Sequence, residues 1–348
     1  MFMEIQTFTL ENKSKASVSF CNIGAGITSV IVPDREGNMA DVVLGYKNLK
    51  DYIGDGPCMG KTPGRYANRI AKGILKIQDK EYRLPVNNGE NHLHGGDKGF
   101  ANQLWEGEQS ENRVTFKYFS KDGEAGYPGN LTAQVVYSWS EDNELTIELT
   151  AISDALTVCN LTNHSYFNLK GENAGNILDH KLKLYASKYL PTDSRLIPTG
   201  DLADVKGTPM DFTDWKLIGE DINKRFDALT FGKGYDNCWV IDNNVTFDSS
   251  NTRCHKSGIV SPAAELSCDK SGRKLTVYTD SCGIQVYTGN WLNGCPESKS
   301  GRSYQDYDGV ALECQSFPDS PSRSNFPDVL LLAGKQYKNI IKFKFSNI

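Results

Sequence analysis

The segment of this sequence richest in groups that exchange protons is 160–169, which reads NLTNHSYFNL. It places His164, one of five histidines in the chain, among asparagines, hydroxyls and aromatic rings. At the two-residue period of a strand, Thr162, His164, Tyr166 and Asn168 share one face, and every side chain on it can form hydrogen bonds. This row is either the floor of a polar pocket, with His164 as an acid or base, or it holds a structural histidine satisfied by its neighbours.

A second candidate is Glu313 in YDGVALECQSFPDSP (307–321). Val310, Leu312 and Cys314 form the apolar face of a short strand, and Glu313 points to the other side. A buried carboxylate is costly unless it is paired, hydrogen-bonded or retains its proton. Glu313 is therefore expected either to act at a site or to lie in solvent at a sheet edge, and the local pattern alone favours the edge.

Two further segments carry cationic or ligating groups. GRYANRIAKG (64–73) contains Arg65 and Arg69, whose forked donors suit sugar hydroxyls or carboxylates, although surface salt bridges are the simpler interpretation. In NHLHGG (91–96), His92 and His94 share a face if the chain is extended. Two histidines at this spacing can chelate a metal, but no H-E-x-x-H motif supplies further ligands, so we expect no metal.

One lysine motif resembles a phosphate-binding loop without being one. GKTPG (60–64) contains Gly-Lys-Thr, but proline follows at once and the upstream glycine of a phosphate loop is missing. The sequence also lacks a G-x-S-x-G elbow and a dinucleotide-binding glycine pattern after a strand. Nucleotide binding and serine-hydrolase chemistry are therefore disfavoured.

The elements that must position these groups are strands. Apolar and polar residues alternate over 113–119, 144–152, 274–279 and 340–346, and turn sequences separate such runs at short intervals. This spacing is typical of an all-β sandwich or barrel. We expect one antiparallel domain over 1–348, with a short helix possible over 211–222. The polar segment 243–258 is predicted to be an exposed hairpin or insertion of undetermined role.

Composition narrows the partners and the location. The formal charge is −5 with no block of Lys and Arg, which argues against nucleic acid and against an anionic membrane surface. No secretory signal or apolar stretch of membrane-spanning length is visible. The nine cysteines are scattered and never form C-x-x-C, as expected for reduced thiols. We expect a cytoplasmic protein, monomeric or homodimeric, that binds a small molecule.

Taken together, these segments resemble the galactose mutarotase (aldose 1-epimerase) family. The similarity runs in order along nearly the whole chain and is specific because many motifs recur together. They are GRYANRIAKG (64–73), LHGG followed by GF (93–100), NLTNHSYFNL (160–169), YLPTDSRLIPTGDLADVKGTPMDF (189–212), GYDNCWV (234–240), IQVYTGNWL (284–292), and LECQSFPDS followed by NFP (312–327).

The resemblance implies a large antiparallel β-sandwich with few short helices. It also implies cofactor-free interconversion of the α and β anomers of free aldohexoses such as galactose and glucose. The family's general acid corresponds to His164 and its general base to Glu313. Its sugar contacts correspond to Asn68, Arg69, His94, Ser165, Tyr166, Asp236 and Gln285.

The departures from the family pattern are small. Phe100-Ala101-Asn102 stands where the family often has Phe-Asp-Lys, and Asn237 and Cys238 differ from the commonest form. These changes leave His164 and Glu313 in place but put the finer sugar preference in doubt. Two alternatives stay open: a sugar-binding protein without turnover, and an epimerase for hexose 6-phosphates, which would need additional cations around its pocket.

Overall fold

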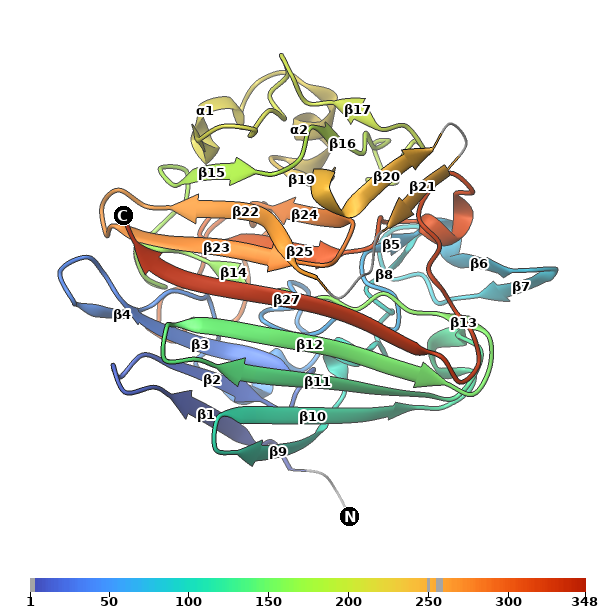
Figure 1. The fold of residues 1–348 in the computed structure, drawn as a ribbon, viewed down its shortest axis with the longest axis horizontal. Coiled ribbons are helices and arrows are strands. Elements are labelled where there is room, and N and C mark those ends of the chain that lie inside the picture. Colours follow the sequence, from blue (N-terminus) through green and yellow to red (C-terminus); the bar gives the residue numbers. More distant parts are fainter. Residues whose placement is uncertain (1–3, 249–250, 255–258) are drawn as a thin grey trace.

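The computed structural model describes residues 4–248, 251–254 and 259–348 (Figure 1). Its largest element is a nine-stranded antiparallel sheet in the order β18-β15-β22-β23-β27-β12-β11-β10-β9. The strands of this sheet are β9 Glu106–Ser110, β10 Arg113–Ser120, β11 Leu131–Trp139, β12 Glu144–Ser153, β15 Lys181–Leu184, β18 Lys216–Leu217, β22 Ser261–Ser267, β23 Arg273–Thr279 and β27 Gln336–Asn347.

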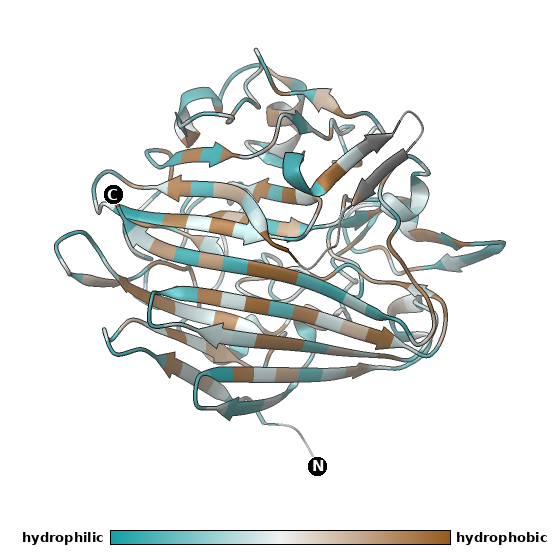
Figure 2. Cartoon of the chain, viewed as in Figure 1, coloured by the Kyte–Doolittle hydropathy of each residue, from teal (hydrophilic) through white to brown (hydrophobic). Residues whose placement is uncertain are grey.

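The alternating segments of the sequence are the long strands of this sheet, namely β10, β12, β23 and β27, so these predictions are confirmed. In β12, Leu145, Ile147 and Leu149 are fully buried, and the intervening residues are partly exposed. Figure 2 shows the same alternation of hydrophobic and hydrophilic residues along neighbouring strands. Burial of each such leucine stabilises the fold by about 1.5–3 kcal/mol. The alternation therefore fixes which face of the sheet is turned inward.

Two smaller antiparallel sheets complete the sandwich. A six-stranded sheet has the order β14-β25-β24-β19-β16-β17, and a four-stranded sheet the order β1-β2-β3-β4. Buried residues of all three sheets belong to one apolar cluster, for example Val30, Leu149 and Leu312. The strands are β1 Thr7–Glu11, β2 Ser17–Cys21, β3 Gly26–Pro33, β4 Met39–Asp41, β14 Tyr166–Phe167, β16 Lys188–Tyr189, β17 Ala203–Asp204, β19 Asp236–Val240, β24 Gly283–Tyr287 and β25 Val310–Gln315.

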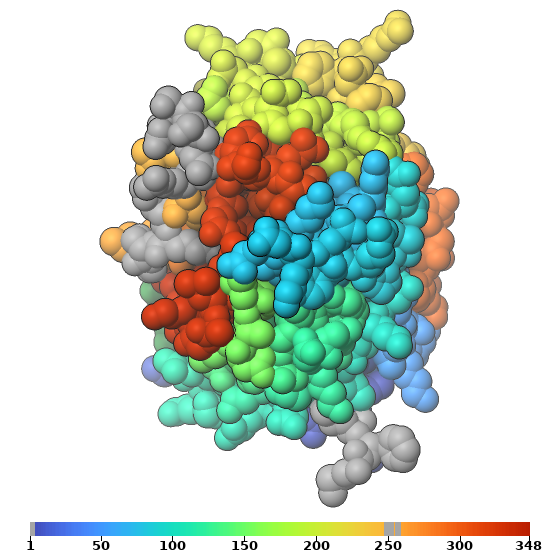
Figure 3. All heavy atoms as spheres, turned by 90° about the vertical axis from the view of Figure 1, so that its right-hand side faces the viewer, coloured from blue at the N-terminus to red at the C-terminus, as the bar shows by residue number. Residues whose placement is uncertain are grey.

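Short two-stranded sheets and turns surround this sandwich. The short pairs are β5 Arg69–Ile70 with β8 His92–Leu93, β6 Ile74–Ile77 with β7 Lys80–Arg83, and β13 Thr157–Val158 with β26 Leu330–Leu331. Short 3-10 turns cover Leu49–Tyr52, Ala71–Gly73, Phe100–Asn102, Glu124–Gly126, Asp242–Asn244 and Ser320–Ser322. The segment carrying Ser320–Ser322 packs beside the residues near position 70 (Figure 3), where the Asp319 N–H donates to the Arg69 carbonyl at 2.8 Å.

The two α-helices of the described residues are short, α1 Ile218–Asp221 and α2 Asp227–Gly232. The short helix expected within 211–222 is confirmed as α1, which covers Ile218–Asp221 of that range, while residues 216–217 form β18. The prediction of a hairpin within 243–258 is confirmed for its backbone, since β20 Val245–Asp248 pairs with β21 Asn251–Cys254. Residues 249–250 and 255–258 lie outside the described residues. Among the described helices, none has the length and apolar character needed to cross a membrane.

Candidate active site

Glu313 lies in the interior of the six-stranded sheet. Its strand, β25, is flanked by β14 on one side and β24 on the other. The side chain is only 2% exposed, so the expectation of a solvent-exposed edge is wrong. The reason is long-range: β14 and β24 cover both edges of β25, and a local pattern does not show which strands will pair. Glu313 is instead a buried carboxylate that lines a cavity.

His164 lies just before β14, in a segment without regular strand structure. Two backbone hydrogen bonds hold it: its N–H donates to the Lys61 carbonyl and its carbonyl accepts from the Gly60 N–H, each at 2.9 Å. The predicted polar face is only partly formed. His164 and Tyr166 line one cavity, whereas the Thr162 hydroxyl donates to the Cys314 carbonyl and the Asn168 amide donates to backbone carbonyls elsewhere.

The two candidates for proton transfer meet in this structure. Nε2 of His164 lies 3.4 Å from Oε1 of Glu313, and both side chains are buried. Burial lowers the pKa of His164 to about 4. Burial raises the pKa of the Glu313 carboxyl well above its usual range, and the Asp236 carboxylate raises it further, while the Arg69 guanidinium opposes this. Burial therefore favours the neutral form of both groups, an uncharged imidazole and a protonated carboxyl.

Arg69, Asp236 and Gln285 form a row beside Glu313, joined by one ion pair and one hydrogen bond. Gln285 is paired with Glu313 across β24 and β25, and its amide donates to Oδ1 of Asp236 at 2.7 Å. A guanidinium nitrogen of Arg69 lies 3.6 Å from Oδ2 of Asp236, and Arg69 Nε donates to the Asn88 side chain at 3.1 Å. The register of β19, β24 and β25 thus places Asp236 and Glu313 at the cavity with the Gln285 amide behind them, and Arg69 of β5 lies against Asp236.

His94 and His92 have different surroundings, which corrects the expectation that they share a face. The strand β8 ends at Leu93, and His94 takes the left-handed backbone conformation with φ of 53°. His92 is buried, and its ring nitrogens contact the Pro85 carbonyl at 2.6 Å and the Tyr127 hydroxyl at 2.7 Å. His94 instead lines the cavity with His164, its ring centroid 5.3 Å away.

A backbone bond fixes the chemical form of His94. The Asn68 N–H donates to Nδ1 of His94 at 3.1 Å, so in the neutral ring Nε2 carries the hydrogen. Burial lowers the pKa of His94 well below its usual value, and the nearby His164 and Arg69 lower it further. His94 is therefore a neutral hydrogen-bond donor rather than a base. The Asn68 side chain, which also lines the cavity, accepts from the Arg69 N–H at 2.9 Å.

The remaining predicted contacts differ in how they reach the cavity. Tyr166 lines it, and its hydroxyl donates to the Pro57 carbonyl at 2.9 Å. Ser165 and Gln285 are buried but are not among the lining residues. The Ser165 hydroxyl is buried without a hydrogen-bond partner in the described part of the chain. Gln285 reaches the site through its bond to Asp236.

Comparison with known proteins identifies the family of this chain. The model of the aldose 1-epimerase family matches residues 6–344. The chain belongs to the aldose 1-epimerase family. It is 40% identical to the galactose mutarotase of Bos taurus over 342 residues, which cover 98% of this chain and 94% of that protein. It is 34% identical to the aldose 1-epimerase of Escherichia coli strain K12, covering 97% of this chain and 94% of that one.

Solved structures give the same result for the fold. The crystal structure of an aldose epimerase homologue from C. elegans superposes with a TM-score of 0.88 at 28% identity, covering 99% of this chain and all of that one. The galactose 1-epimerase from Lactobacillus acidophilus gives 0.83, also at 28% identity, with 99% of each chain covered. The all-β sandwich expected from the sequence is thus the fold of this aldose epimerase family.

The cavity of this aldose epimerase has a volume of about 800 Å³. Several of its lining residues were not singled out by the sequence analysis, among them Pro57, Asn88, Arg195, Tyr287 and Trp291. Trp291 is 60% exposed. An exposed tryptophan is unusual for a core-forming residue, but no local pattern marks it as part of a cavity wall. Its place in the motif IQVYTGNWL was the only available signal.

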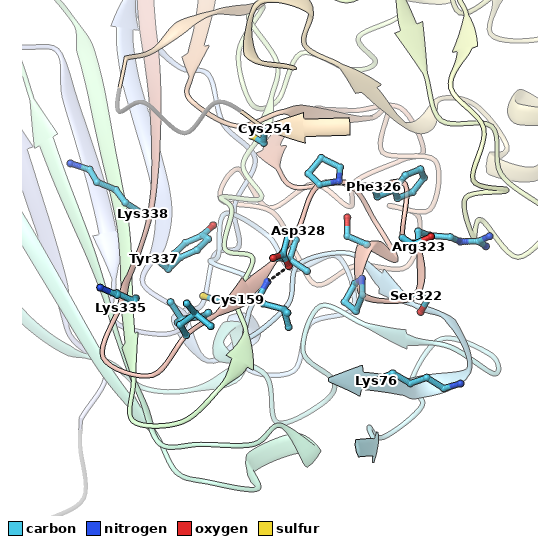
Figure 4. A pocket seen from close by; sticks show the side chains of 18 of the residues that line it. Lys76, Cys159, Cys254, Ser322, Arg323, Phe326, Asp328, Lys335, Tyr337 and Lys338 are labelled. Carbon is cyan, nitrogen blue, oxygen red and sulfur yellow. Dashed lines mark hydrogen bonds between the residues drawn. The ribbon is translucent and has the colours of Figure 1, made fainter. Parts of the chain in front are cut away.

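A larger cavity, of about 1290 Å³, lies elsewhere and contains none of the predicted site residues (Figure 4). Its wall is formed mainly by residues 320–332 and 335–338. Figure 4 shows Lys76 on the opposite side of it from Lys335 and Lys338, so these cations do not converge on one point. Size alone therefore does not identify the active site, which is marked by its paired polar groups.

His94, His164 and Glu313 also raise the question of a metal ion. One potential ligand atom of each lies within 4.8 Å of the others. Nδ1 of His94, however, already accepts the Asn68 N–H, and Nε2 then carries the ring hydrogen. A metal ligand must offer a free lone pair, which neither nitrogen of His94 does in this arrangement. The three groups fit a hydroxylated ligand better than a metal ion.

Proposed function

We propose that this aldose epimerase interconverts the α and β anomers of free aldohexoses such as galactose and glucose, with Glu313 and His164 moving the two protons. The observation that carries the proposal is the 3.4 Å separation of Nε2 of His164 and Oε1 of Glu313 at the wall of a polar cavity. The C1 hydroxyl and the ring oxygen of a pyranose are bonded to the same carbon. An acid and a base this close together can therefore reach both oxygens.

The reaction needs two proton transfers and one rotation. Removal of the proton from the C1 hydroxyl and delivery of a proton to the ring oxygen break the C1–O5 bond and leave an open-chain aldehyde. Rotation about C1–C2 presents the other face of the aldehyde, and the reverse transfers close the ring. The pair holds one proton before and after each turnover, so no cofactor is consumed. Each positioned acid or base contributes about 10²- to 10⁴-fold to the rate.

The roles within the pair follow the family resemblance, with Glu313 as base and His164 as acid. Burial alone favours the shared proton on Glu313. We propose that the proton passes to His164 when the C1 hydroxyl lies beside Glu313, and the guanidinium of Arg69 supports this because it favours the anionic carboxylate. Ring closure reverses both transfers, so each group acts as acid and as base once per turnover.

The sugar contacts are proposed from the donors and acceptors that face the cavity. Arg69 and Nε2 of His94 donate hydrogen bonds, and the Asp236 carboxylate accepts them. Asn68 and Tyr166 add polar groups to the wall. The two buried residues, Gln285 and Ser165, are proposed to act from behind this wall, with the Gln285 amide holding Asp236 in place. These contacts orient the pyranose so that C1 faces the catalytic pair, which is the positioning contribution to the rate.

The test is an anomer-exchange assay. Fresh α-galactose is mixed with the protein, and the appearance of the β anomer is followed with a β-specific dehydrogenase. We expect strong acceleration over buffer. Calorimetric sugar binding without acceleration would instead indicate a binding protein. Activity on glucose 6-phosphate but not on galactose would indicate the phosphosugar alternative. The lining arginines, Arg69 and Arg195, each lie beside a carboxylate, which disfavours a phosphate site there.

The pH dependence of kcat/KM should show the titration of the pair. The active form holds one proton, so activity falls when His164 is protonated in addition to Glu313, near pH 4. It also falls when Glu313 loses the last proton, at a pH well above the usual glutamate pKa. We expect a bell-shaped pH profile of kcat/KM with a broad plateau around neutral pH, measured by polarimetry from pH 3.5 to 10. An acid limb near pH 6.5, the ordinary histidine pKa, would contradict this account.

Metal removal should leave the rate unchanged, because the proposed chemistry requires only Glu313 and His164. The protein is dialysed against EDTA, its metal content is measured by mass spectrometry, and kcat is compared before and after. A loss of activity that Zn²⁺ or Mn²⁺ restores would show that the group His94, His164 and Glu313 holds a functional ion.

We also propose that residues 1–348 form one domain that acts in the cytoplasm as a monomer or homodimer. The continuity of the apolar core across the three large sheets supports the single domain. The nine scattered cysteines, which never form C-x-x-C, support a reducing compartment. Light scattering coupled to size-exclusion chromatography distinguishes a monomer of 38.6 kDa from a dimer.

A further inference from the structure

A buried ion pair lies next to the cavity without lining it. Lys61 and Asp55 form this pair, and both side chains are fully buried, with 0% exposure. The Lys61 ammonium also donates to the Tyr52 carbonyl at 2.6 Å and to Oδ1 of Asn102 at 3.0 Å. Lys61 is the lysine of the Gly-Lys-Thr segment, and Asn102 is one of the departures from the family pattern. Neither residue has a part in the proposed chemistry.

The pair joins the two ends of a short segment, residues 55–61, which we call the 55–61 loop. Its first residue, Asp55, also accepts the Met59 N–H at 2.8 Å and the Tyr46 hydroxyl at 3.0 Å, both at Oδ2. Its last residue is Lys61. Both ends of the loop are thereby fixed to each other and to the core around Tyr46 and Tyr52.

The 55–61 loop contacts the active site at several points. Its residues Gly56 and Pro57 line the cavity. The Pro57 carbonyl accepts the hydroxyl of Tyr166 at 2.9 Å. The Gly60 N–H donates to the His164 carbonyl, and the His164 N–H donates to the Lys61 carbonyl, each at 2.9 Å. The loop therefore sets both the backbone of His164 and the direction of the Tyr166 side chain.

The backbone of the loop follows an unusual path. Cys58 and Gly60 take left-handed conformations, with φ of 58° and 70°. A Cβ at Gly60 would lie 2.0 Å from the Ile27 carbonyl oxygen, so this approach is possible only for glycine. A non-glycine residue such as Cys58 adopts this region at an energetic cost. A loop with such a backbone needs fixed ends to keep one conformation.

We propose that the Asp55–Lys61 ion pair is a positioning device that holds the 55–61 loop and, through it, His164 and Tyr166 in the geometry for proton transfer. The inference rests on the proposed function. Apolar residues of similar volume usually stabilise a core at least as well as a buried ion pair. The ion pair instead fixes one geometry of the 55–61 loop, because its donors and acceptors are bonded to defined partners at both ends of the loop.

The charge of Lys61 also acts on His164. Burial lowers the pKa of His164 most, and the Lys61 ammonium lowers it further. Removing the ammonium should therefore raise the pKa of His164, because a nearby cation disfavours the imidazolium. The other polar or titratable groups near the ring come from separate elements and stay unchanged in such a variant: Glu313, His94, Tyr166 and Tyr287.

The decisive variant is the double substitution Lys61→Met with Asp55→Leu, which replaces the pair with apolar side chains of similar size. We expect it to fold and its kcat to fall about 10- to 100-fold, as expected for a small displacement of a catalytic group. KM for galactose should change much less than kcat. The pKa of His164, followed by NMR of its ring, should rise, because Lys61 lowers this pKa and Asp55 is not among the groups that shift it.

The matched control is Lys216→Met. Lys216 is also a largely buried lysine, donating to the Pro209 carbonyl and to Asp221, but none of these residues lines the cavity. This variant should keep the kcat and the His164 pKa of the wild type. A folded double variant with both values unchanged overturns the proposal. A double variant that does not fold overturns it too, because the pair then serves the fold as a whole.

Failure of this inference can be told apart from failure of the proposed function. Absence of anomer exchange by the wild-type protein would refute the proposed function. The ring titration of His164 needs no turnover, so it still tests whether the ion pair acts on this residue. Normal wild-type exchange with an unaffected double variant would refute only the positioning role.

Discussion

Replacing Glu313 by glutamine is expected to lower kcat for anomer exchange by about 10²- to 10⁴-fold while the protein stays folded. Glutamine has nearly the same shape, but its amide cannot take the proton of the C1 hydroxyl. Burial already favours the neutral form of Glu313, so the exchange for a neutral amide removes no buried charge. The loss should appear in kcat more than in KM, because the pair acts on the transition state. Polarimetry with fresh α-galactose measures both constants.

The matched control for this variant is Glu172→Gln. Glu172 is also buried, and it accepts the Tyr304 hydroxyl at 2.7 Å away from the lining residues of the cavity. The kcat of the Glu172→Gln variant should equal that of the wild type. His164→Gln should lose about as much activity as Glu313→Gln, and the double variant little more, because the two groups act as a unit. A Glu313→Gln enzyme with wild-type kcat would contradict the proposed mechanism.

The strands of this fold follow from local sequence because their alternation is strong. Leu145, Ile147 and Leu149 had to face one way, and in the structure they are fully buried. The short helix expected within 211–222 is present at Ile218–Asp221 only, for a physical reason. A helix of a few residues has little stability of its own and forms where tertiary packing supports it. Ile218 and Asp221 are buried and supply that packing.

The site was harder to predict because its residues depend on long-range pairing. The local pattern of its strand favours an edge position for Glu313, whereas β25 is an inner strand between β14 and β24. His94 was grouped with His92 by alternation, which the left-handed conformation of His94 interrupts. The family resemblance supplied His164 and Glu313 as partners. The structure adds their separation of 3.4 Å, which no local pattern contains.

The two arginines of GRYANRIAKG show the same limit most clearly. Residue type and spacing alone make Arg65 and Arg69 equivalent candidates, and only the family resemblance singles out Arg69. Arg69 lines the cavity, whereas Arg65 is buried and donates to the Pro128 carbonyl at 2.7 Å, the Gly129 carbonyl at 3.0 Å and the Ser120 hydroxyl at 2.6 Å. The forked guanidinium that suits a sugar also suits a set of carbonyl groups. Which of the two it meets depends on the fold.

Arg65→Met is therefore expected to lower the free energy of unfolding by about 2–6 kcal/mol, because it leaves the buried carbonyls of Pro128 and Gly129 without their donors. The fraction of the Arg65→Met variant that remains folded should retain the wild-type KM for galactose, since Arg65 does not line the cavity. Arg69→Met should show the opposite pattern, with a raised KM and a smaller loss of stability. Urea unfolding followed by tryptophan fluorescence, together with the anomer assay, measures both quantities.

The control for general effects of arginine removal is Arg113→Met, at the exposed start of β10. A surface substitution of this kind changes the free energy of unfolding by about 0.5 kcal/mol or less. Equal stability of the Arg65 and Arg113 variants would show that the buried guanidinium is dispensable. A raised KM in Arg65→Met would place this residue at the sugar instead. The pair of arginine variants thus separates the structural arginine of the motif from the one proposed to bind substrate.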